Sequence, residues 1–191
     1  MGPLDGIIVL DLSRILAGPF STQMLADLGA TVWKVESPWG DDTRRWGPPF
    51  VESESAYYLS TNRGKKSVVV NLRDERGQGL IRQMAQDADV LVENFKVGDL
   101  ARYGLDYDSM ANLNPRLVYA SVTGFGQTGS RASEPGYDAA LQGMTGIMSV
   151  TGEPDGPPSK VGVAWIDILT GMTATIGILS ALNERHGSGK G

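Results

Sequence analysis

Apolar and polar residues alternate along the first 120 positions with two different periods. Short β-branched, mostly apolar runs are typical of buried parallel strands, and they cover residues 7–12, 31–35, 67–71, 90–92 and 117–122. Between the strands, apolar residues three and four positions apart predict helices over residues 18–28 and 74–88, the second capped by Asp74.

Strand, helix and strand follow each other with short joins, as in right-handed parallel crossovers. This order predicts an α/β fold with a doubly wound, mostly parallel, Rossmann-like sheet. Residues 37–50 are rich in Gly, Pro, Asp and Arg and predict a long functional loop. Residues 137–150 and 168–185 predict two further helices, and we expect no apolar stretch long enough to span a bilayer.

Composition narrows the chemistry that this chain can perform. The 191 residues carry a net charge of −5, which argues against nucleic acid as the main partner. There is no cysteine, and His186 is the single histidine, so thiolate nucleophiles, Ser-His-Asp triads and multi-His metal sites are disfavoured. Because the N-terminus shows no signal peptide, we expect a cytoplasmic protein, or a mitochondrial matrix protein whose transit peptide was removed.

A glycine-rich segment at residues 124–129 has the spacing of a dinucleotide-binding fingerprint and follows a predicted strand. Pro135 and Gly136 come next, where a helix N-terminus would be needed to hold a pyrophosphate. A wall of glycines that lets a ligand approach the backbone is therefore favoured over a nicotinamide or flavin site.

Positive charge is concentrated in one part of this acidic chain. The residues concerned are Arg44, Arg45, Arg63, Lys65, Lys66 and Arg73. They could capture an anionic ligand such as the phosphates of coenzyme A, but a solvated face is the preferred interpretation from the pattern alone.

Asp167 is a carboxylate within the mostly apolar stretch 161–171. An Asp directly before an apolar helix is a common N-cap. A carboxylate in a dry site at a helix N-terminus is also a candidate nucleophile toward a thioester carbonyl. The two roles are compatible.

Five ordered motifs resemble those of the class III coenzyme A transferases. They lie at residues 25–36, 62–67, 93–95, 121–129 and 167–171, and the resemblance covers the whole chain. It implies the N-terminal part of that family's large domain over residues 1–186, with a glycine-rich tail at 187–191 where the family continues into a second domain. It also implies an interlocked homodimer in the full-length form, and we expect the 191 residues alone to bind coenzyme A weakly and not to turn over.

The resemblance also implies roles for individual residues. Asp167 matches the acyl-accepting aspartate. The positions that contact coenzyme A in the family correspond to Ile15, Leu16, Arg73, Asn94, Phe95, Arg102 and Tyr103, and those lining the acid pocket correspond to Trp46, Tyr57, Tyr137 and Asp138. Ser37 and Pro135 stand where some members place basic residues, so the phosphate contacts are expected to differ.

The implied reaction is transfer of coenzyme A from an acyl-CoA donor to a carboxylic acid, through aspartyl anhydride and aspartyl-CoA intermediates on Asp167. No permanent cofactor, metal or membrane partner is expected. Residues 41–50 resemble the succinyl-CoA-dependent branch that handles dicarboxylates, with Arg44 or Arg45 as candidates to hold a distal carboxylate. Oxalate is disfavoured, because oxalate-using members show Gln where this chain has Leu16.

Besides the transferase, two other functions stay open, and the nicotinamide enzyme is disfavoured as stated above. One is an acyl-CoA racemase or epimerase of the same fold, but those enzymes carry a His where this chain has Tyr137. The other is an inactive acyl-CoA-binding fragment.

Overall fold

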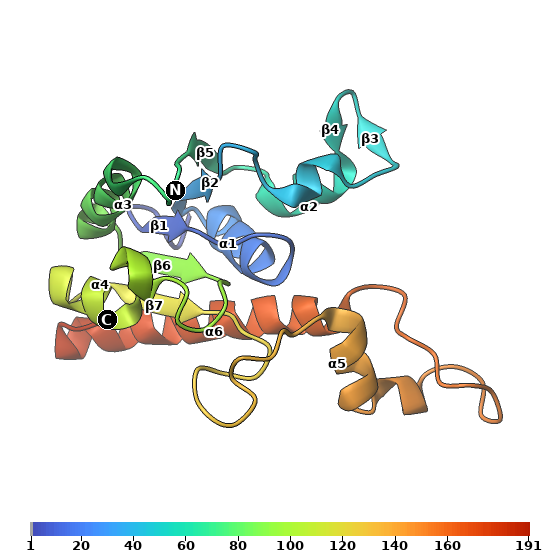
Figure 1. Cartoon of the computed structure of the whole chain (residues 1–191). Helices are drawn as coiled ribbons and strands as arrows, with labels where there is room; N and C mark the ends of the chain where they lie inside the picture. The colour runs from blue at the N-terminus through green and yellow to red at the C-terminus, as the bar shows by residue number, and fades with distance from the viewer. Residues whose placement is uncertain (1) are drawn as a thin grey trace.

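A parallel five-stranded sheet forms the centre of the computed structural model, which describes residues 2–191 (Figure 1). Its strands are β1 (Ile8–Asp11), β2 (Thr31–Glu36), β5 (Lys66–Val69), β6 (Val90–Glu93) and β7 (Val118–Ser121). Their spatial order is β5-β2-β1-β6-β7, and all four pairings are parallel. The predicted α/β class and doubly wound sheet are confirmed.

From β1 the chain adds β2 and then β5 toward one edge of the sheet. It then returns to the other side of β1, where it adds β6 and β7 toward the opposite edge. Ligands of doubly wound sheets bind outside the carboxyl ends of the strands where the order reverses. In this chain the reversal lies between β1 and β6, so the loops after Asp11 and Glu93 are the expected place for a site.

Helices cover both faces of the sheet (Figure 1). On one face, α1 (Ala17–Asp27) and α6 (Trp165–Ser188) bury Leu25 and Ile178 against the strands. On the other, α3 (Glu75–Asp87) and α4 (Tyr107–Leu113) bury Ile81 and Met110. Asp74 caps α3 as predicted, accepting a hydrogen bond from the Arg76 backbone N–H at 2.9 Å.

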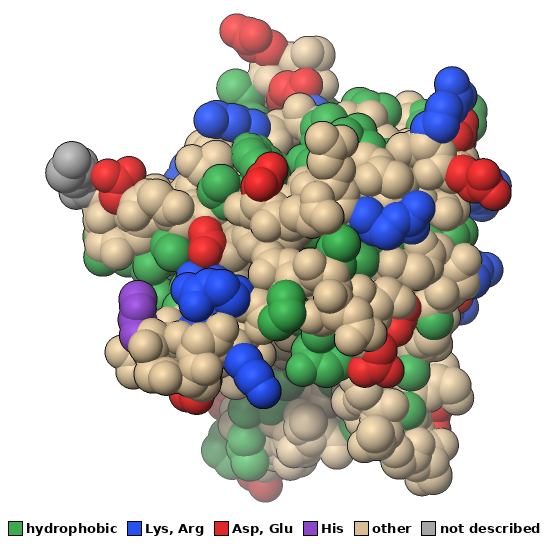
Figure 2. All heavy atoms as spheres, turned by 90° about the vertical axis from the view of Figure 1, so that its left-hand side faces the viewer, with side chains coloured by type: hydrophobic (Ala, Val, Ile, Leu, Met, Phe, Trp, Pro, Cys, Tyr) green, Lys and Arg blue, Asp and Glu red, His purple; other side chains and the backbone are tan. Residues whose placement is uncertain are grey.

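The outer surface near α3, α4 and the C-terminus has mixed charge. In Figure 2, which views the molecule from the left-hand side of Figure 1, acidic and basic side chains are interspersed with apolar ones. A mixed surface of this kind is typical of a solvent-exposed face and does not form a single-signed field.

Several short elements were not predicted from the sequence pattern. The predicted loop at 37–50 holds the 3₁₀ turn η1 (Asp42–Arg45), and the hairpin of β3 (Phe50–Val51) and β4 (Glu54–Ser55) leads into α2 (Ala56–Asn62). A second 3₁₀ turn, η2 (Ala101–Tyr103), and α4 are likewise additional. The helix predicted at 137–150 is two pieces, α5 (Asp138–Met144) and η3 (Ile147–Val150), because Gly146 has a φ of 81°.

The last helix is longer than predicted. By length and composition alone, α6 could cross a membrane, so the expectation that no apolar stretch reaches that length is wrong. In the fold, one side of α6 packs along α1. Its Thr175 hydroxyl lies 3.0 Å from that of Ser21, and Arg185 pairs with Asp89 at 2.9 Å. These polar contacts are those of a helix packed within a folded domain.

Candidate active site

Two adjoining cavities lie at the carboxyl ends of β1 and β6, where the strand order reverses. The first has a volume of about 260 Å³ and the second about 520 Å³. Arg14, from the loop after β1, and Phe95, from the loop after β6, line both. A single extended ligand could therefore occupy the two cavities together.

Asp167 lies in the first cavity, in the first turn of α6. Its side chain is half-buried, and burial together with the charge of Asp138 raises its pKa to about 6. Ile15, Leu16, Asn94, Phe95, Tyr137 and Asp138, all proposed from the resemblance, line the same cavity. The fold thus gathers these residues from three separate segments around this carboxylate.

Asp167 does not cap its own helix, which corrects one of the two roles assigned to it. The helix begins at Trp165, and its N-cap residue Ala164 supplies no side-chain hydrogen bond. Instead Oδ1 of Asp138, from α5, accepts hydrogen bonds from the backbone N–H groups of Ile166 at 2.7 Å and Asp167 at 3.2 Å. The Asp167 carboxylate is left to face the cavity.

The loop after β1 has a constrained backbone beside the cavity. Ile15 has a φ of 70°, a left-handed conformation that a β-branched residue rarely adopts. The preceding residue is fixed by Asn94, whose side chain accepts from the Arg14 N–H at 2.9 Å and donates to the Arg14 carbonyl at 2.7 Å. The side chain of Asn94, proposed as a coenzyme A contact, therefore ties the two site loops together.

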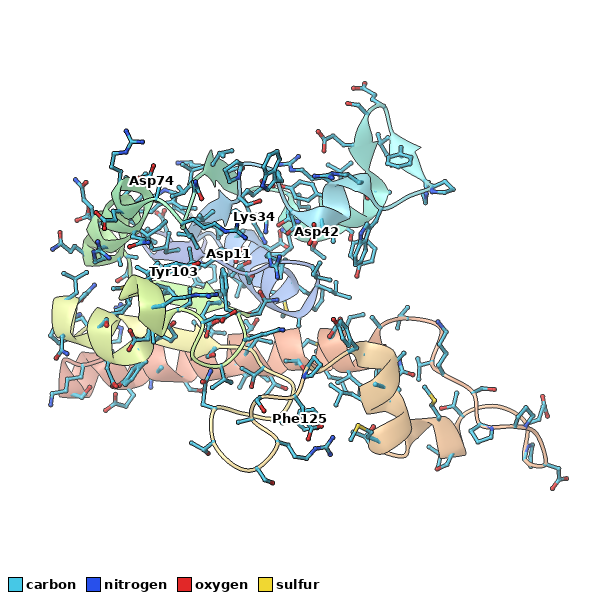
Figure 3. The ribbon with its side chains drawn as sticks, viewed as in Figure 1. Asp11, Lys34, Asp42, Asp74, Tyr103 and Phe125 are labelled. Carbon is cyan, nitrogen blue, oxygen red and sulfur yellow. The ribbon has the colours of Figure 1, made fainter. Side chains whose placement is uncertain are left out.

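The second cavity carries the basic residues proposed to contact coenzyme A. Arg73, Arg102 and Tyr103 line it, and the guanidinium of Arg102 lies 5.0 Å from the centre of the Tyr103 ring. Figure 3 shows Tyr103 on the same side of the molecule as α4. Cationic and aromatic side chains in one cavity suit a ligand with phosphate groups and a flat ring.

Trp46 and Tyr57, proposed to line the acid pocket, line neither cavity. Their rings pack edge to face with centres 5.2 Å apart. Burial and the nearby charges of Asp167 and Asp138 raise the pKa of Tyr57 to about 12. The Tyr57 phenol is therefore close enough to both carboxylates to respond to their charge.

Several residues of the predicted basic cluster are engaged within the protein. The side chain of Lys65 is buried, and its ammonium donates to Asp11 at 3.1 Å and to Asn62 at 3.0 Å. Asp11, the last residue of β1, lies beside Lys34 of β2 (Figure 3). Lys65 thus stabilises the ends of the strands that support the site, and the solvated-face interpretation is wrong for it.

Arg44, proposed to hold a distal carboxylate, is also bound internally. Its guanidinium makes two hydrogen bonds to Glu36, at 2.7 and 2.8 Å, and a third to Glu54 at 3.0 Å. It also stacks on Tyr58, at 3.9 Å from the ring centre. These partners make Arg44 part of the scaffold that holds η1 and β4 against β2.

Gly124, the first residue of the glycine-rich segment, lines the first cavity, and the segment lacks the geometry of a dinucleotide site. A Cβ atom added to Gly124 would lie 2.5 Å from the Cα of Gly136, so the two backbones touch and only glycine fits. After β7 ends at Ser121, the next helix begins only at Asp138. No helix N-terminus follows the motif in this described segment, as a pyrophosphate site would require.

Sequence reasoning missed two residues that shape the site. Arg14 lines both cavities, and a basic residue directly after a strand at the switch point could have indicated it. Gln142 is fully buried on α5 and donates to Asp138 at 2.7 Å. No sequence signal points to Gln142, because its role depends on a contact between separate elements.

Comparison with known proteins agrees with the fold and with this arrangement. The chain is 56% identical, over 99% of its length and 49% of the relative's, to the succinate–glutarate CoA-transferase of Agrobacterium fabrum. It is 50% identical, over its whole length and 49% of the relative's, to the acetyl-CoA:oxalate CoA-transferase of Acetobacter aceti. The chain thus spans about half the length of the curated relatives it matches.

A solved structure shows the same fold at high similarity. The crystal structure of a CAIB/BAIF family protein from Brucella suis superposes with a TM-score of 0.97 at 55% sequence identity, covering 100% of this chain and 51% of that one. The family model of CoA-transferase family III matches residues 4–191. With these matches over nearly every residue, the chain belongs to CoA-transferase family III.

Proposed function

We propose that this chain carries the coenzyme A site and the nucleophile of an enzyme that transfers coenzyme A from an acyl-CoA to a dicarboxylic acid. One observation carries the proposal: Asp167, a half-buried carboxylate, lies in a cavity that shares Arg14 and Phe95 with a second cavity, which Arg73 and Arg102 also line. An acyl-CoA could place its phosphates beside Arg73 and Arg102 and its thioester beside Asp167.

The proposed reaction conserves the energy of the thioester by covalent catalysis. The Asp167 carboxylate attacks the thioester carbonyl, and the carbon–sulfur bond breaks to give a mixed anhydride and the coenzyme A thiolate. The thiolate attacks the aspartyl carbonyl, which releases the donor acid and leaves an aspartyl-CoA thioester. The acceptor carboxylate then displaces the thiolate to form a second anhydride. The thiolate attacks the acceptor carbonyl, which yields the new acyl-CoA and regenerates Asp167.

Dicarboxylates are the proposed acceptors because the two relatives above are named for succinate, glutarate and oxalate, all of which carry two carboxylates. The donor is proposed to be succinyl-CoA, following the relative with 56% identity. The presence of an oxalate enzyme among relatives of 50% identity means that Leu16 by itself is a weak guide to the acceptor. Acceptor choice therefore needs measurement with each acid in turn.

A racemase is disfavoured by the position of the one histidine. His186 lies near the C-terminal end of α6, nineteen positions after Asp167. At 1.5 Å per residue it is roughly 28 Å away, too far to exchange a proton with a substrate beside Asp167.

Substitution of the nucleophile tests the proposal. Exchange is measured in a form extended to the length of the relatives, because the 191 residues alone are expected not to turn over. In Asp167→Asn of that form, coenzyme A exchange between succinyl-CoA and glutarate should fall on the order of a thousandfold or more, because an amide cannot form the anhydride. In the wild type, hydroxylamine added with succinyl-CoA should convert Asp167 to a hydroxamate that mass spectrometry locates. The matched control is Asp155→Asn, which removes an exposed carboxylate far from the cavity and should leave exchange unchanged. Near-normal exchange by Asp167→Asn, or a label on another residue, would exclude Asp167 as the nucleophile.

A further inference from the structure

Asp138 is bonded to the backbone that carries Asp167. Its Oδ1 accepts from the N–H groups of both Ile166 and Asp167, at 2.7 and 3.2 Å. Helix α6 has no side-chain cap of its own. These are two of the four N–H groups that a helix leaves without a partner inside its first turn. The start of α6 is therefore fixed by a residue from another helix.

Gln142 in turn fixes Asp138. Its side chain is fully buried one turn along α5, and its Nε2 donates to Oδ2 of Asp138 at 2.7 Å. The same amide group binds the loop that leads into α6. Oε1 accepts from the Val161 N–H at 2.8 Å, and Nε2 also donates to the Val163 carbonyl at 3.2 Å. Both oxygens of Asp138 and both polar atoms of Gln142 are thus used.

We propose that Asp138 is a positioning residue that holds Asp167 for attack, with Gln142 holding Asp138 in turn. This inference rests on the proposed function and assigns Asp138 a task other than the acid-pocket contact implied by family resemblance. Misplacing a reacting atom by about 1 Å can cost about a hundredfold in rate. A carboxylate bonded to the nucleophile's own N–H sets where the nucleophile sits.

The charge of Asp138 has a second effect on Asp167. After burial, it is the other cause that raises the pKa of the Asp167 carboxyl to about 6. Other titratable groups also face this region: Tyr57 from α2 and, around the first cavity, Arg14, Lys96, Glu134 and Tyr137. Removing the charge of Asp138 should lower the pKa of Asp167. The pKa should stay above its ordinary value, because the burial of Asp167 remains.

Two substitutions separate the hydrogen bonds from the charge. Asp138→Asn keeps an oxygen that can accept from the two N–H groups but loses the charge. Asp138→Ala loses both. The control is again Asp155→Asn, which removes one negative charge from an exposed loop outside the cavity.

Two of the three readouts do not depend on catalysis. Titration of Asp167, followed by carboxyl ¹³C NMR, should move to lower pH in Asp138→Asn and stay unchanged in the control. Amide hydrogen exchange at Ile166 and Asp167 should be at least about tenfold faster in Asp138→Ala and near the wild-type rate in Asp138→Asn. In CoA exchange, kcat should fall about 10- to 100-fold in Asp138→Ala, with little change in KM for the acyl-CoA.

Unchanged exchange at these two amides in Asp138→Ala would overturn the inference, and an unchanged titration of Asp167 in Asp138→Asn would overturn the effect of charge. If Asp138→Ala does not fold, amide exchange at Ile166 and Asp167 in Gln142→Ala decides, because that variant removes the group that holds Asp138. Expected shifts in a wild type that shows no CoA exchange even when extended to the length of its relatives would leave the positioning role standing and reject the proposed function instead.

Discussion

At the scale of single residues, Asp167 combines two requirements that oppose each other. A nucleophilic carboxylate must be ionised, yet burial and Asp138 favour its neutral form and raise its pKa to about 6. At pH 7 a group with this pKa is still about nine-tenths ionised. The poorly solvated anion is more reactive than one in water, and the folded protein is less stable for holding it.

The first prediction is that the rate of CoA exchange falls on the acid side with a midpoint near pH 6, because protonation of Asp167 removes the nucleophile. An unperturbed Asp would lose its charge only near its ordinary pKa of 3.8. The measurement is kcat/KM against pH with an acyl-CoA donor whose own groups do not titrate in this range. Full activity down to pH 5 would contradict the raised pKa of Asp167.

The same shift predicts a pH-dependent effect on stability. A carboxyl whose folded pKa is raised binds its proton more tightly in the folded state, so its contribution to stability is greatest at low pH and is lost as pH rises through about 6. Asp167→Asn should therefore raise Tm at pH 7 and change it little at pH 4. Thermal unfolding at both pH values checks this, and an equal change in Tm at both would contradict it.

At the scale of elements, the packing of α6 on α1 depends on one glycine. A Cβ atom on Gly171 would lie 2.7 Å from the Ala17 carbonyl oxygen and 3.0 Å from the Phe20 ring, so the helices approach at that point closer than any side chain allows. Gly171 follows Asp167 by four positions, one turn along the same helix. The contact sets how close the nucleophile lies to the loop before α1.

Two glycine-to-alanine changes in α6 should have opposite effects. Gly171→Ala should destabilise the fold by about 1–3 kcal/mol through overpacking. Gly177→Ala, in the same helix and with nothing within 4 Å of the added Cβ, should stabilise it by about 0.5–1 kcal/mol through helix propensity. Urea unfolding of the two variants checks the pair, and a stabilising Gly171→Ala would contradict the close approach of the helices.

Elements with strong local signals could be predicted from the sequence, and elements defined by distant contacts could not. The sheet strands followed from β-branched runs, and the cap at Asp74 from its position before a periodic helix. The start of α6 was predicted at residue 168, but the helix begins at Trp165 because Asp138 supplies its cap from another element. Short elements such as α2 carry too few residues for a period to show.

For the site, residue types could be predicted but their partners could not. Asp167 and the residues around it were identified by motif resemblance, and the fold brings most of them to one cavity. In sequence alone, Arg44 and Lys65 cannot be distinguished from cations that bind ligands. Whether such a cation meets a ligand or a buried carboxylate depends on tertiary packing, as with Lys65 and Asp11.

At the scale of the whole molecule, one side of α6 presents an apolar stripe. Trp165, Leu169, Met172 and Ile176 are spaced four, three and four residues apart and are 37%, 39%, 42% and 65% exposed. The opposite side of the helix is buried on α1 and the sheet. Residues at this spacing lie on one face of a helix, and a contiguous apolar face of this kind usually marks a surface that another protein segment covers.

The last prediction follows from this stripe: residues 1–191 alone should self-associate through the exposed face of α6, because pairing two such faces removes apolar surface from water. Ile176→Glu, at the most exposed position of the stripe, should shift the protein toward monomer in sedimentation velocity. Leu80→Glu is the matched control, since Leu80 is an exposed apolar residue at 41% on α3, across the sheet from α6, and its change should leave self-association as it is. A wild type that stays monomeric with rising concentration would contradict the prediction. Equal effects of the two substitutions would show that general charge repulsion, and not the stripe, governs association.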